Sequence, residues 1–352
     1  MTMREWLKFT LKLVVAHALY AVGVLHLWQF IVLRKKAVVL MYHRVLTSEE
    51  RSRTGSHPGI VVDSKAFAKQ MTMLRRRFKV LSADEFVERM ERKVPFDDAS
   101  CLITFDDGWR DNFTHALPVL EQNGLPALVF LPVNFIGTRR LFWQESLTRL
   151  TLQAVLQGRS QSGRRGRFRQ VLSPVCLDSM VDLPDHDPRP AIMEAVRRQK
   201  SLDRSVIDAT LASLADELGS REDGHECLDG FLDWEQVNNM AGRGVSFGGH
   251  GAEHRILTFV SATEARDEIC TAKSVIEGHL KKSVPTFSYP NGNWSSDVAM
   301  LVKESGYRLA FTTEPGFVRS DDDPFTVRRV NIHEGLMNST PLFLARDRKS
   351  TR

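Results

Sequence analysis

The chain has 352 residues, 42% of them hydrophobic and 26% charged, which is the composition of a globular protein with one large domain or two smaller ones. Its net charge of +5 favours an anionic partner, such as a membrane surface or a phosphate-bearing ligand. It contains no zinc-finger spacing and no basic helix with regularly interleaved aromatic residues, so we do not expect nucleic acid as a partner.

The amino-terminal segment is uncharged and mostly apolar over residues 13–33, with lysines before it and three basic residues after it. A helix that crosses a bilayer needs about 20 apolar residues, so the length is sufficient. No small-residue cleavage site of the signal-peptide kind is present. We therefore expect a membrane-anchor helix at residues 1–36, spanning the bilayer or lying in its interface. The alternative is a long buried helix of the globular domain.

Short apolar runs alternate with segments of helical periodicity between residues 37 and 137. The runs expected as strands are 37–45, the end of 67–82, 100–108 and 126–137, and the expected helices are the start of 67–82, 84–92 and 113–124. Strands that alternate with helices pair in parallel and carry the helices outside the sheet. The pattern therefore predicts an α/β barrel or an open α/β sheet.

This alternation stops between residues 138 and 230, where the helical segments carry many charges. Residues 158–170 are rich in glycine, serine and arginine, and residues 182–190 have the composition of an irregular connector. A run of charges is usually a solvated loop, although these arginines could also contact lipid phosphates. We expect a largely helical insertion.

The α/β alternation returns at residue 231. The expected helices are 231–244, 261–280 and 295–306, and the expected strands are 245–251, 285–292, 308–313 and 325–333. The predicted organisation is an anchor helix at 1–36, a barrel in two parts at 37–137 and 231–345, a helical insertion at 138–230 and a basic tail at 346–352.

Two adjacent carboxylates, Asp106 and Asp107, end one apolar run and are followed by Gly108. An Asp-Gly pair is common in turns. A phosphotransfer site would need its second aspartate two positions from the first, and that spacing is absent. The third interpretation is a metal site in which one aspartate binds the cation and its neighbour acts as a base. Adjacent side chains on an extended backbone diverge, so Asp107 would face the metal and Asp106 its water.

His250 and His254 favour the metal interpretation, because they follow a predicted strand and are four residues apart. On one helical turn, residues i and i+4 face the same way and can bind one ion. The pair alone is a weak signal, since many helices carry two histidines by chance. With Asp107 it supplies the three protein ligands that a catalytic zinc site combines with an open position for water.

The order of these motifs resembles the polysaccharide deacetylases, carbohydrate esterase family 4, which contain the NodB homology domain. TFDDG at 104–108 and the two histidines at 250–254 resemble the first two motifs of this family. SYPNG at 288–292 stands where the family has an R-x-P-Y-G type loop, and VNIH at 330–333 stands where it has a late Leu-x-His.

MYHRV at 41–45 and LDWEQV at 232–237 resemble a membrane-associated branch of the family, which has a Tyr-His first strand and a tryptophan-bearing helix before the histidine motif. The resemblance covers about residues 37–137 and 231–345. It implies a distorted (β/α) barrel that holds one divalent metal ion. Zinc is commonest in the family, and cobalt, nickel or manganese are alternatives.

The resemblance also implies roles for residues of these motifs. Asp107, His250 and His254 are the implied metal ligands, and Asp106 is the implied base that accepts a proton from metal-bound water. This division is chemically sensible, because a cation lowers the pKa of bound water and an ionised neighbour can accept its proton.

The residues implied around the substrate are Asn291, Tyr289 and His333. The backbone N–H of Asn291 would stabilise the developing oxyanion, Tyr289 belongs to the same loop, and His333 is the candidate acid for the departing amine. His43 lies at a predicted strand end that faces the same side. It is a candidate substrate contact, with a core histidine as the equal alternative.

Four residues depart from the family pattern. Asn291 replaces the usual aromatic residue, and Asn331 replaces the usual leucine two residues before His333. Ser288 occupies the place of the arginine that normally supports the catalytic aspartate, so we expect Arg328 or Arg329 to support Asp106 if any arginine does. Gly251 replaces the hydroxyl residue that usually follows the first histidine.

The expected function is removal of an N-acetyl or related acyl group from an amino-sugar glycan or a polyprenyl-linked sugar. Membrane lipid is the second expected partner, and the bacterial inner membrane, with its cytoplasmic face preferred, is the expected location. One alternative is a deformylase or O-acyl esterase with the same site. Another is a non-catalytic glycan-binding domain of a polysaccharide-synthesis complex, which the missing arginine at Ser288 would favour.

Overall fold

The structure is a computed structural model that describes residues 33–97, 99–184, 187–219 and 228–333. Its first compact unit comprises the described parts of Met1–Ser48, Gly59–Thr138 and Phe231–Arg352, and its second those of Glu49–Pro58 and Arg139–Gly230. The predicted basic tail and nearly all of the predicted anchor helix lie outside the described residues. Within the described part of the chain, no helix is long and apolar enough to cross a membrane.

The first unit is built on an eight-stranded sheet in which every pair of neighbouring strands is parallel. Its strands are β1 (Ala37–Tyr42), β4 (Lys79–Val80), β5 (Ser100–Phe105), β6 (Ala127–Leu131), β7 (Val245–Gly249), β8 (Thr286–Ser288), β9 (Leu309–Phe311) and β10 (Val330–Asn331). The order is β10-β1-β5-β6-β7-β8-β9, with β4 beside the start of β5. A separate two-stranded sheet pairs β2 (Arg44–Leu46) with β3 (Val61–Asp63).

Residues 327–331 link the two edges of the large sheet. Val327 forms a parallel bridge with Phe311 of β9, and Val330 pairs with Leu40 of β1. The sheet therefore curls, and the predicted α/β barrel is confirmed. In a barrel of parallel strands, the loops after the strands gather at one mouth, so the residues that follow each strand become neighbours.

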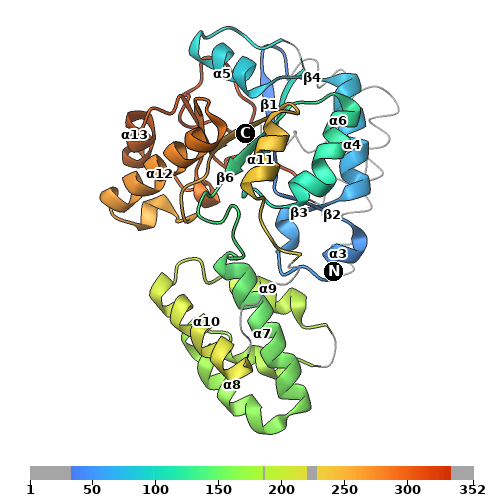
Figure 1. Cartoon of the computed structure of the whole chain (residues 1–352), viewed down its shortest axis with the longest axis vertical. Coiled ribbons are helices and arrows are strands. Elements are labelled where there is room, and N and C mark those ends of the chain that lie inside the picture. The colour runs from blue at the N-terminus through green and yellow to red at the C-terminus, as the bar shows by residue number, and fades with distance from the viewer. Residues whose placement is uncertain (1–32, 98, 185–186, 220–227, 334–352) are drawn as a thin grey trace. The chain divides into compact units, whose positions relative to one another are not determined.

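Helices surround this sheet (Figure 1). They are α4 (Ser64–Arg77), α5 (Ala83–Glu91), α6 (Leu117–Asn123), α11 (Trp234–Ala241), α12 (Ala262–Leu280) and α13 (Ser296–Glu304). The short α3 (Ser48–Arg51) follows β2, and all of it but Ser48 belongs to the second unit. A π-helical turn, Asn112–Ala116, leads into α6. Side chains of Asp63, Ser82, Asp233, Ser261 and Ser295 accept backbone N–H bonds at the starts of α4, α5, α11, α12 and α13. These caps satisfy N–H groups that lack a partner within the helix.

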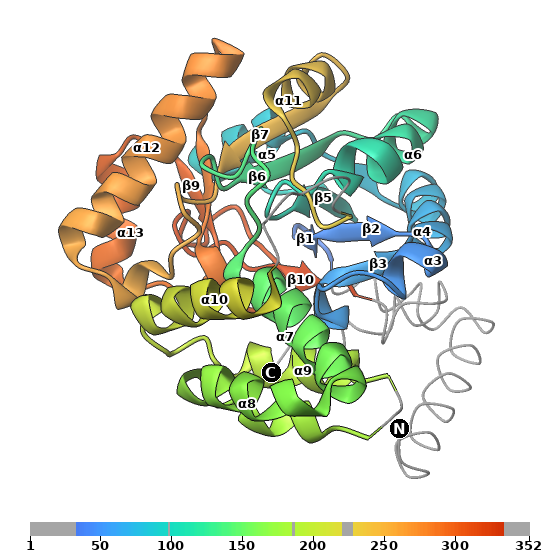
Figure 2. The same cartoon turned by 60° about the horizontal axis from the view of Figure 1, so that its bottom comes forward.

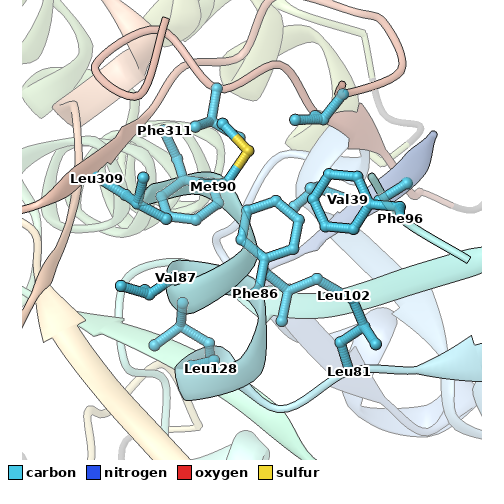
Figure 3. Packing of buried hydrophobic residues seen from close by; sticks show 14 of the residues in the cluster. Val39, Leu81, Phe86, Val87, Met90, Phe96, Leu102, Leu128, Leu309 and Phe311 are labelled. Atoms are coloured by element: carbon cyan, nitrogen blue, oxygen red, sulfur yellow. The ribbon is translucent and has the colours of Figure 1, made fainter. Parts of the chain in front are cut away.

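One apolar cluster packs α5 against strands β1, β5, β6 and β9 (Figure 3). Phe86 of α5 stacks on Phe96 and approaches Phe311 of β9, with ring centroids 5.2 and 6.1 Å apart. Leu102 of β5 belongs to this cluster. Because side chains two residues apart share one face of a strand, the interior changes along β5 from Leu102 through Thr104 to Asp106.

The second unit is helical (Figure 2). Its α-helices are α7 (Trp143–Ser160), α8 (Arg165–Leu172), α9 (Arg189–Arg197) and α10 (Arg204–Leu218), which pack around a buried apolar core. Buried hydrogen bonds fix residues 49–58 to this unit. Thr54 and the backbone N–H of Gly55 donate to Asp229, and Ser56 donates to Glu145.

Candidate active site

The predicted site residues follow the carboxyl ends of several parallel strands. Asp106 and Asp107 follow β5, His250 follows β7, and His43 follows β1. The strands β1 and β5 are neighbours, and the backbone N–H of Asp106 donates to the Tyr42 carbonyl at 2.9 Å. Parallel pairing thus brings residues that are far apart in the sequence to one mouth.

Asp107, His250 and His254 form the one candidate metal-binding group of three or more residues in the described part of the chain. Oδ1 of Asp107 lies 3.4 Å from Nε2 of His250 and 3.3 Å from Nε2 of His254. The three ligand atoms lie within 4.8 Å of one another. Asp107 and His250 are buried, and His254 is half-buried.

The two histidines do not lie on a helical turn, as the four-residue spacing suggested. Residues 250–254 are an irregular loop after β7, and His254 has a left-handed backbone with φ 54°. The two rings nevertheless lie close together, with their centroids 4.8 Å apart, because a tight loop can also bring residues i and i+4 together.

Glu268 of α12 binds the backbone of this loop. Its Oε2 accepts the backbone N–H groups of Ala252 and Glu253 at 2.8 and 2.9 Å. A Cβ at Gly251, where φ is +78°, would lie 2.8 Å from the same oxygen. The Gly251 departure from the family pattern therefore leaves room for a buried carboxylate, a partner that the sequence did not indicate.

Asp107 and Gly108 make the turn at the end of β5, both in the left-handed region with φ of 73° and 63°. A Cβ at Gly108 would lie 2.7 Å from a methyl group of Leu131, so glycine is required there. The divergence of Asp106 and Asp107 therefore arises from a turn and not from strand alternation. The prediction of diverging side chains on an extended backbone was wrong at Asp107.

The first histidine is oriented by a hydrogen bond on its other nitrogen. Nδ1 of His250 lies 2.7 Å from the carbonyl oxygen of Ser288. In the neutral ring this bond places the proton on Nδ1 and the lone pair on Nε2, which faces Asp107. Metal-bound histidines are commonly fixed in this way.

The charges of the group are coupled. Burial raises the pKa of Asp107, but the hydrogen bond that Nε2 of His250 donates when the ring is protonated, together with the charge of protonated His254, outweighs burial and holds the pKa well below its usual range. Burial lowers the pKa of His250, but Asp107 and Asp106 outweigh it and raise the pKa above its ordinary value. The site therefore stabilises a negative charge on Asp107 and positive charges on the histidines beside it. A buried site with these charge preferences is also suited to a divalent cation.

Arg329 supports Asp106, and Arg328 does not. Nη1 and Nη2 of Arg329 each lie 2.7 Å from one carboxylate oxygen of Asp106, which makes a two-pronged ion pair, and Nη2 also donates to Oγ of Ser288 at 2.8 Å. Both partners are buried. The neighbouring Arg328 is exposed. The serine at the family's arginine position thus receives an arginine from elsewhere in the chain.

This ion pair decides the protonation of Asp106. Burial raises the pKa of Asp106, but the Arg329 guanidinium and His250 outweigh burial and hold the pKa below its ordinary value. Oδ1 accepts one hydrogen bond from Arg329, and a carboxylate oxygen has two lone-pair sites. An ionised Asp106 therefore keeps a lone-pair site for a further proton.

Tyr289, Asn291 and His333, the other residues predicted around the substrate, are not part of the Asp107, His250 and His254 group. Tyr289 is fully buried and its hydroxyl donates to the Phe325 carbonyl at 3.0 Å, so that hydroxyl is directed to the protein and not to a substrate. Asn291 is exposed on the loop after β8 with φ 58°. His333 is half-buried two residues beyond Asn331, which pairs with Met41.

His43 lies among the charges of the site. Its Nδ1 is buried and has no hydrogen-bond partner among the described residues. Burial lowers the pKa of His43, and the carboxylates of Asp107 and Asp106 oppose this effect only in part. The roles predicted for His43, Asn291 and His333 remain predictions.

The donor set fits a divalent cation of the zinc type. Two imidazole nitrogens and one carboxylate oxygen are the ligands of many catalytic zinc sites. Asp107, His250 and His254 would hold the ion, and the hydrogen bonds to Oδ2 of Asp107 and Nδ1 of His250 lie on atoms that the ion would not need.

Comparison with known sequences assigns the fold and the site to a family. The sequence model described as "Polysaccharide deacetylase" matches residues 93–156 and 198–310, half of the chain. The chain belongs to the polysaccharide deacetylase family. The matched ranges include Asp106, Asp107, His250 and His254, so the predicted enzyme class is confirmed at the level of the family.

Individual relatives of this deacetylase are distant. The protein YxkH of Bacillus subtilis is 19% identical over 305 residues, which are 86% of this chain and 74% of YxkH. The deacetylase PplD of Streptococcus pyogenes, solved in complex with acetate, has a TM-score of 0.56 at 16% identity over 89% of this chain and 97% of PplD. A de-N-acetylase from Aggregatibacter actinomycetemcomitans has a TM-score of 0.52 at 13% identity over 85% of this chain and 95% of its own. These likenesses show the fold.

Proposed function

We propose that this deacetylase is metal-dependent and removes an N-acetyl group from an amino sugar of a lipid-linked or cell-surface glycan. The observation that carries the proposal is the buried Asp107, His250 and His254 group beside an ionised carboxylate, Asp106, that Arg329 holds in place. The description of PplD as a deacetylase with bound acetate and of another structural relative as a de-N-acetylase supports an N-acetyl substrate.

Asp106 is the general base in this proposal. Hydrolysis adds water across the amide C–N bond, and the attacking water must lose a proton. The free lone-pair site on Oδ1 of Asp106 accepts it, while Arg329 keeps the carboxylate ionised and fixed. A positioned general base contributes a factor of about 10² to 10⁴ in rate.

A bound divalent cation supplies positive charge that acidifies water and polarises the acyl carbonyl. Asp107, His250 and His254 would hold the ion. The backbone N–H of Asn291 donates to the acyl oxygen, and His333 gives a proton to the departing amine.

The non-catalytic alternative loses its main support. That alternative depended on the absence of an arginine at Ser288, and Arg329 supplies the guanidinium to the same carboxylate. A domain that only binds glycan would gain nothing from a base that is kept ionised in a buried site.

Acetate release tests the proposal. Purified enzyme should release acetate from polyprenyl-linked or free N-acetylhexosamines, lose this activity on chelation and regain it with zinc, cobalt, nickel or manganese. Asp106→Asn should keep the metal content close to that of the wild type and lower turnover about 100-fold or more. It leaves the guanidinium of Arg329 buried without its counter-ion, so its unfolding temperature should fall, and its metal content reports whether the site stays intact. Metal binding without acyl release from any amino sugar would contradict the proposal.

The same assay separates the related reactions. Loss of an acetyl group, loss of a formyl group and loss of an O-acyl group change the mass of a matched substrate by different amounts or at different positions. A formyl or O-acyl product would assign the site to a deformylase or an esterase.

We also propose that residues 1–36 anchor the enzyme to the bacterial inner membrane, with the catalytic barrel on the cytoplasmic side. The uncharged residues 13–33 between basic flanks support this assignment. The full chain should remain with membranes after a high-salt wash, and a variant without residues 1–32 should be released. Equal distribution of the two proteins would contradict the anchor.

A further inference from the structure

The two oxygens of Asp107 have different neighbours. Oδ1 faces Nε2 of both histidines, whereas Oδ2 accepts a hydrogen bond from Nε1 of Trp109 at 3.0 Å. Trp109 is fully buried, so no water competes for its N–H. The indole therefore decides which carboxylate oxygen points toward the histidines.

The indole ring of Trp109 is packed against two other side chains. The guanidinium carbon of Arg44 lies 4.4 Å from its ring centre, and the ring of Phe231 is stacked on it at 4.6 Å with an interplanar angle of 21°. A guanidinium and an aromatic ring therefore both pack directly against the indole. The ring can neither tilt nor slide without displacing one of them.

Arg44 is itself fixed. Its Nε donates to Oδ2 of Asp111 at 2.9 Å, and Oδ1 of Asp111 accepts the backbone N–H of Val45 at 2.7 Å. Arg44 is fully buried and Asp111 nearly so. Four side chains thus form a continuous buried series in which Asp111 holds Arg44, Arg44 stacks on Trp109, and Trp109 binds Asp107.

We infer that Trp109 and Arg44 are positioning residues that set the affinity and coordination of the metal ion through Asp107. The inference rests on the proposed metal site and extends it. With Oδ2 engaged by Trp109, Asp107 offers the ion one oxygen. Without the indole N–H, the carboxylate turns more freely and can offer both oxygens or neither.

A role in packing alone makes a different prediction. Trp109→Phe keeps an aromatic ring against Arg44 and Phe231 and removes the N–H that reaches Asp107. If Trp109 only fills space, this variant binds metal like the wild type. If the N–H positions Asp107, zinc affinity falls about 10- to 100-fold, the usual effect of removing a group that orients a metal ligand.

The test is zinc titration of the full chain in competition with a chromophoric chelator. Trp294→Phe is the matched control, because its indole N–H also donates to a carboxylate, that of Glu314, at 3.0 Å but outside the metal group. We expect Trp294→Phe to leave zinc affinity unchanged. The visible absorption of cobalt-loaded protein should change in Trp109→Phe, because these bands depend on coordination number and geometry.

Arg44→Lys provides a second variant that keeps the positive charge for Asp111 and loses the planar group that stacks on Trp109. We expect a smaller loss of zinc affinity, and the unfolding temperature in excess chelator reports the fold of each variant. If Trp109→Phe does not fold, Arg44→Lys decides the inference. Wild-type affinity in the folded variants overturns it, whereas a wild-type chain that binds no divalent metal overturns the proposed function with it.

Discussion

Arg329 and Ser288 both donate hydrogen bonds to the carboxylate of Asp106. The serine side chain is small enough to leave room for a guanidinium from the segment before β10, and its hydroxyl accepts a hydrogen bond from that guanidinium. Arg329 also donates Nε to the Thr312 carbonyl at 2.8 Å, so its head group is fixed at both ends. The positive charge beside the Asp106 carboxylate therefore comes from a residue that is close in space and not from the motif itself.

Replacing Arg329 should impair both stability and catalysis. In Arg329→Met the buried carboxylate of Asp106 loses its cation, and breaking a buried ion pair costs about 3–5 kcal/mol. The free energy of unfolding, measured with urea, reports this loss. Arg328→Met changes an exposed neighbour of the same type, and we expect its stability to stay within about 0.5 kcal/mol of the wild type.

The same pair predicts a pH effect. In the wild type the pKa of Asp106 is held below its ordinary value, so the carboxylate is ionised throughout the range above about pH 4. Its contribution to stability is present above that pH and is lost as the pH falls through the lowered pKa. Without Arg329, burial raises the pKa, so the acid limb of kcat/KM should move to higher pH. An unmoved acid limb in an active Arg329→Met variant would contradict Asp106 as the base.

At the scale of helices and strands, the sequence predicted most elements because their patterns are local. The apolar runs at 100–108 and 126–137 became β5 and β6, and the helical periodicity at 261–280 became α12. Some predicted elements were too long at the end where a turn follows. The strand predicted at 100–108, for example, ends at Phe105. The turn that orients Asp107 has room only for glycine at position 108, because Leu131 of β6 lies beside it, and no local pattern contains that neighbour.

Contacts between distant elements were the part of the site that the sequence could not supply. Arg328 and Arg329 are adjacent and chemically equal, and only the sheet register buries one and exposes the other. Trp109 is two residues from Asp107, so its proximity was visible, but the direction of its N–H was not. No pattern in the sequence indicated a role for Glu268. The periodicity of α12 shows that one helix face is apolar, but it does not show which loop lies against the helix.

Glu268 gives a prediction at this scale, because it links α12 to the loop that carries His250 and His254. Glu268→Ala would leave the N–H groups of Ala252 and Glu253 without their acceptor, and we expect zinc affinity to fall about 10- to 100-fold. Glu268→Gln keeps one oxygen that can accept both bonds and should retain most of the affinity. Asp267→Ala, at an exposed position on the same helix, is the control. Equal affinity in the alanine variant and the control would contradict this role.

At the scale of the whole molecule, the chain builds two compact units with separate apolar cores. The catalytic candidates lie in the first unit, and residues 49–58 leave it to join the second through Asp229 and Glu145. The chain thus enters the helical unit twice. The separate cores suggest that a ligand of the first unit stabilises that unit without the same effect on the second.

Metal binding should therefore act on one unfolding transition. A ligand that binds only the folded state at 100 times its Kd adds about 2.7 kcal/mol to the stability of the unit that binds it. In calorimetry of the full chain, zinc should raise the temperature of one transition and chelator should lower it, while a second transition stays in place. His250→Ala should abolish the shift because it removes a ligand. A single transition that moves as a whole would mean that the two cores unfold together, and no shift in the wild type would mean that zinc does not bind the folded first unit.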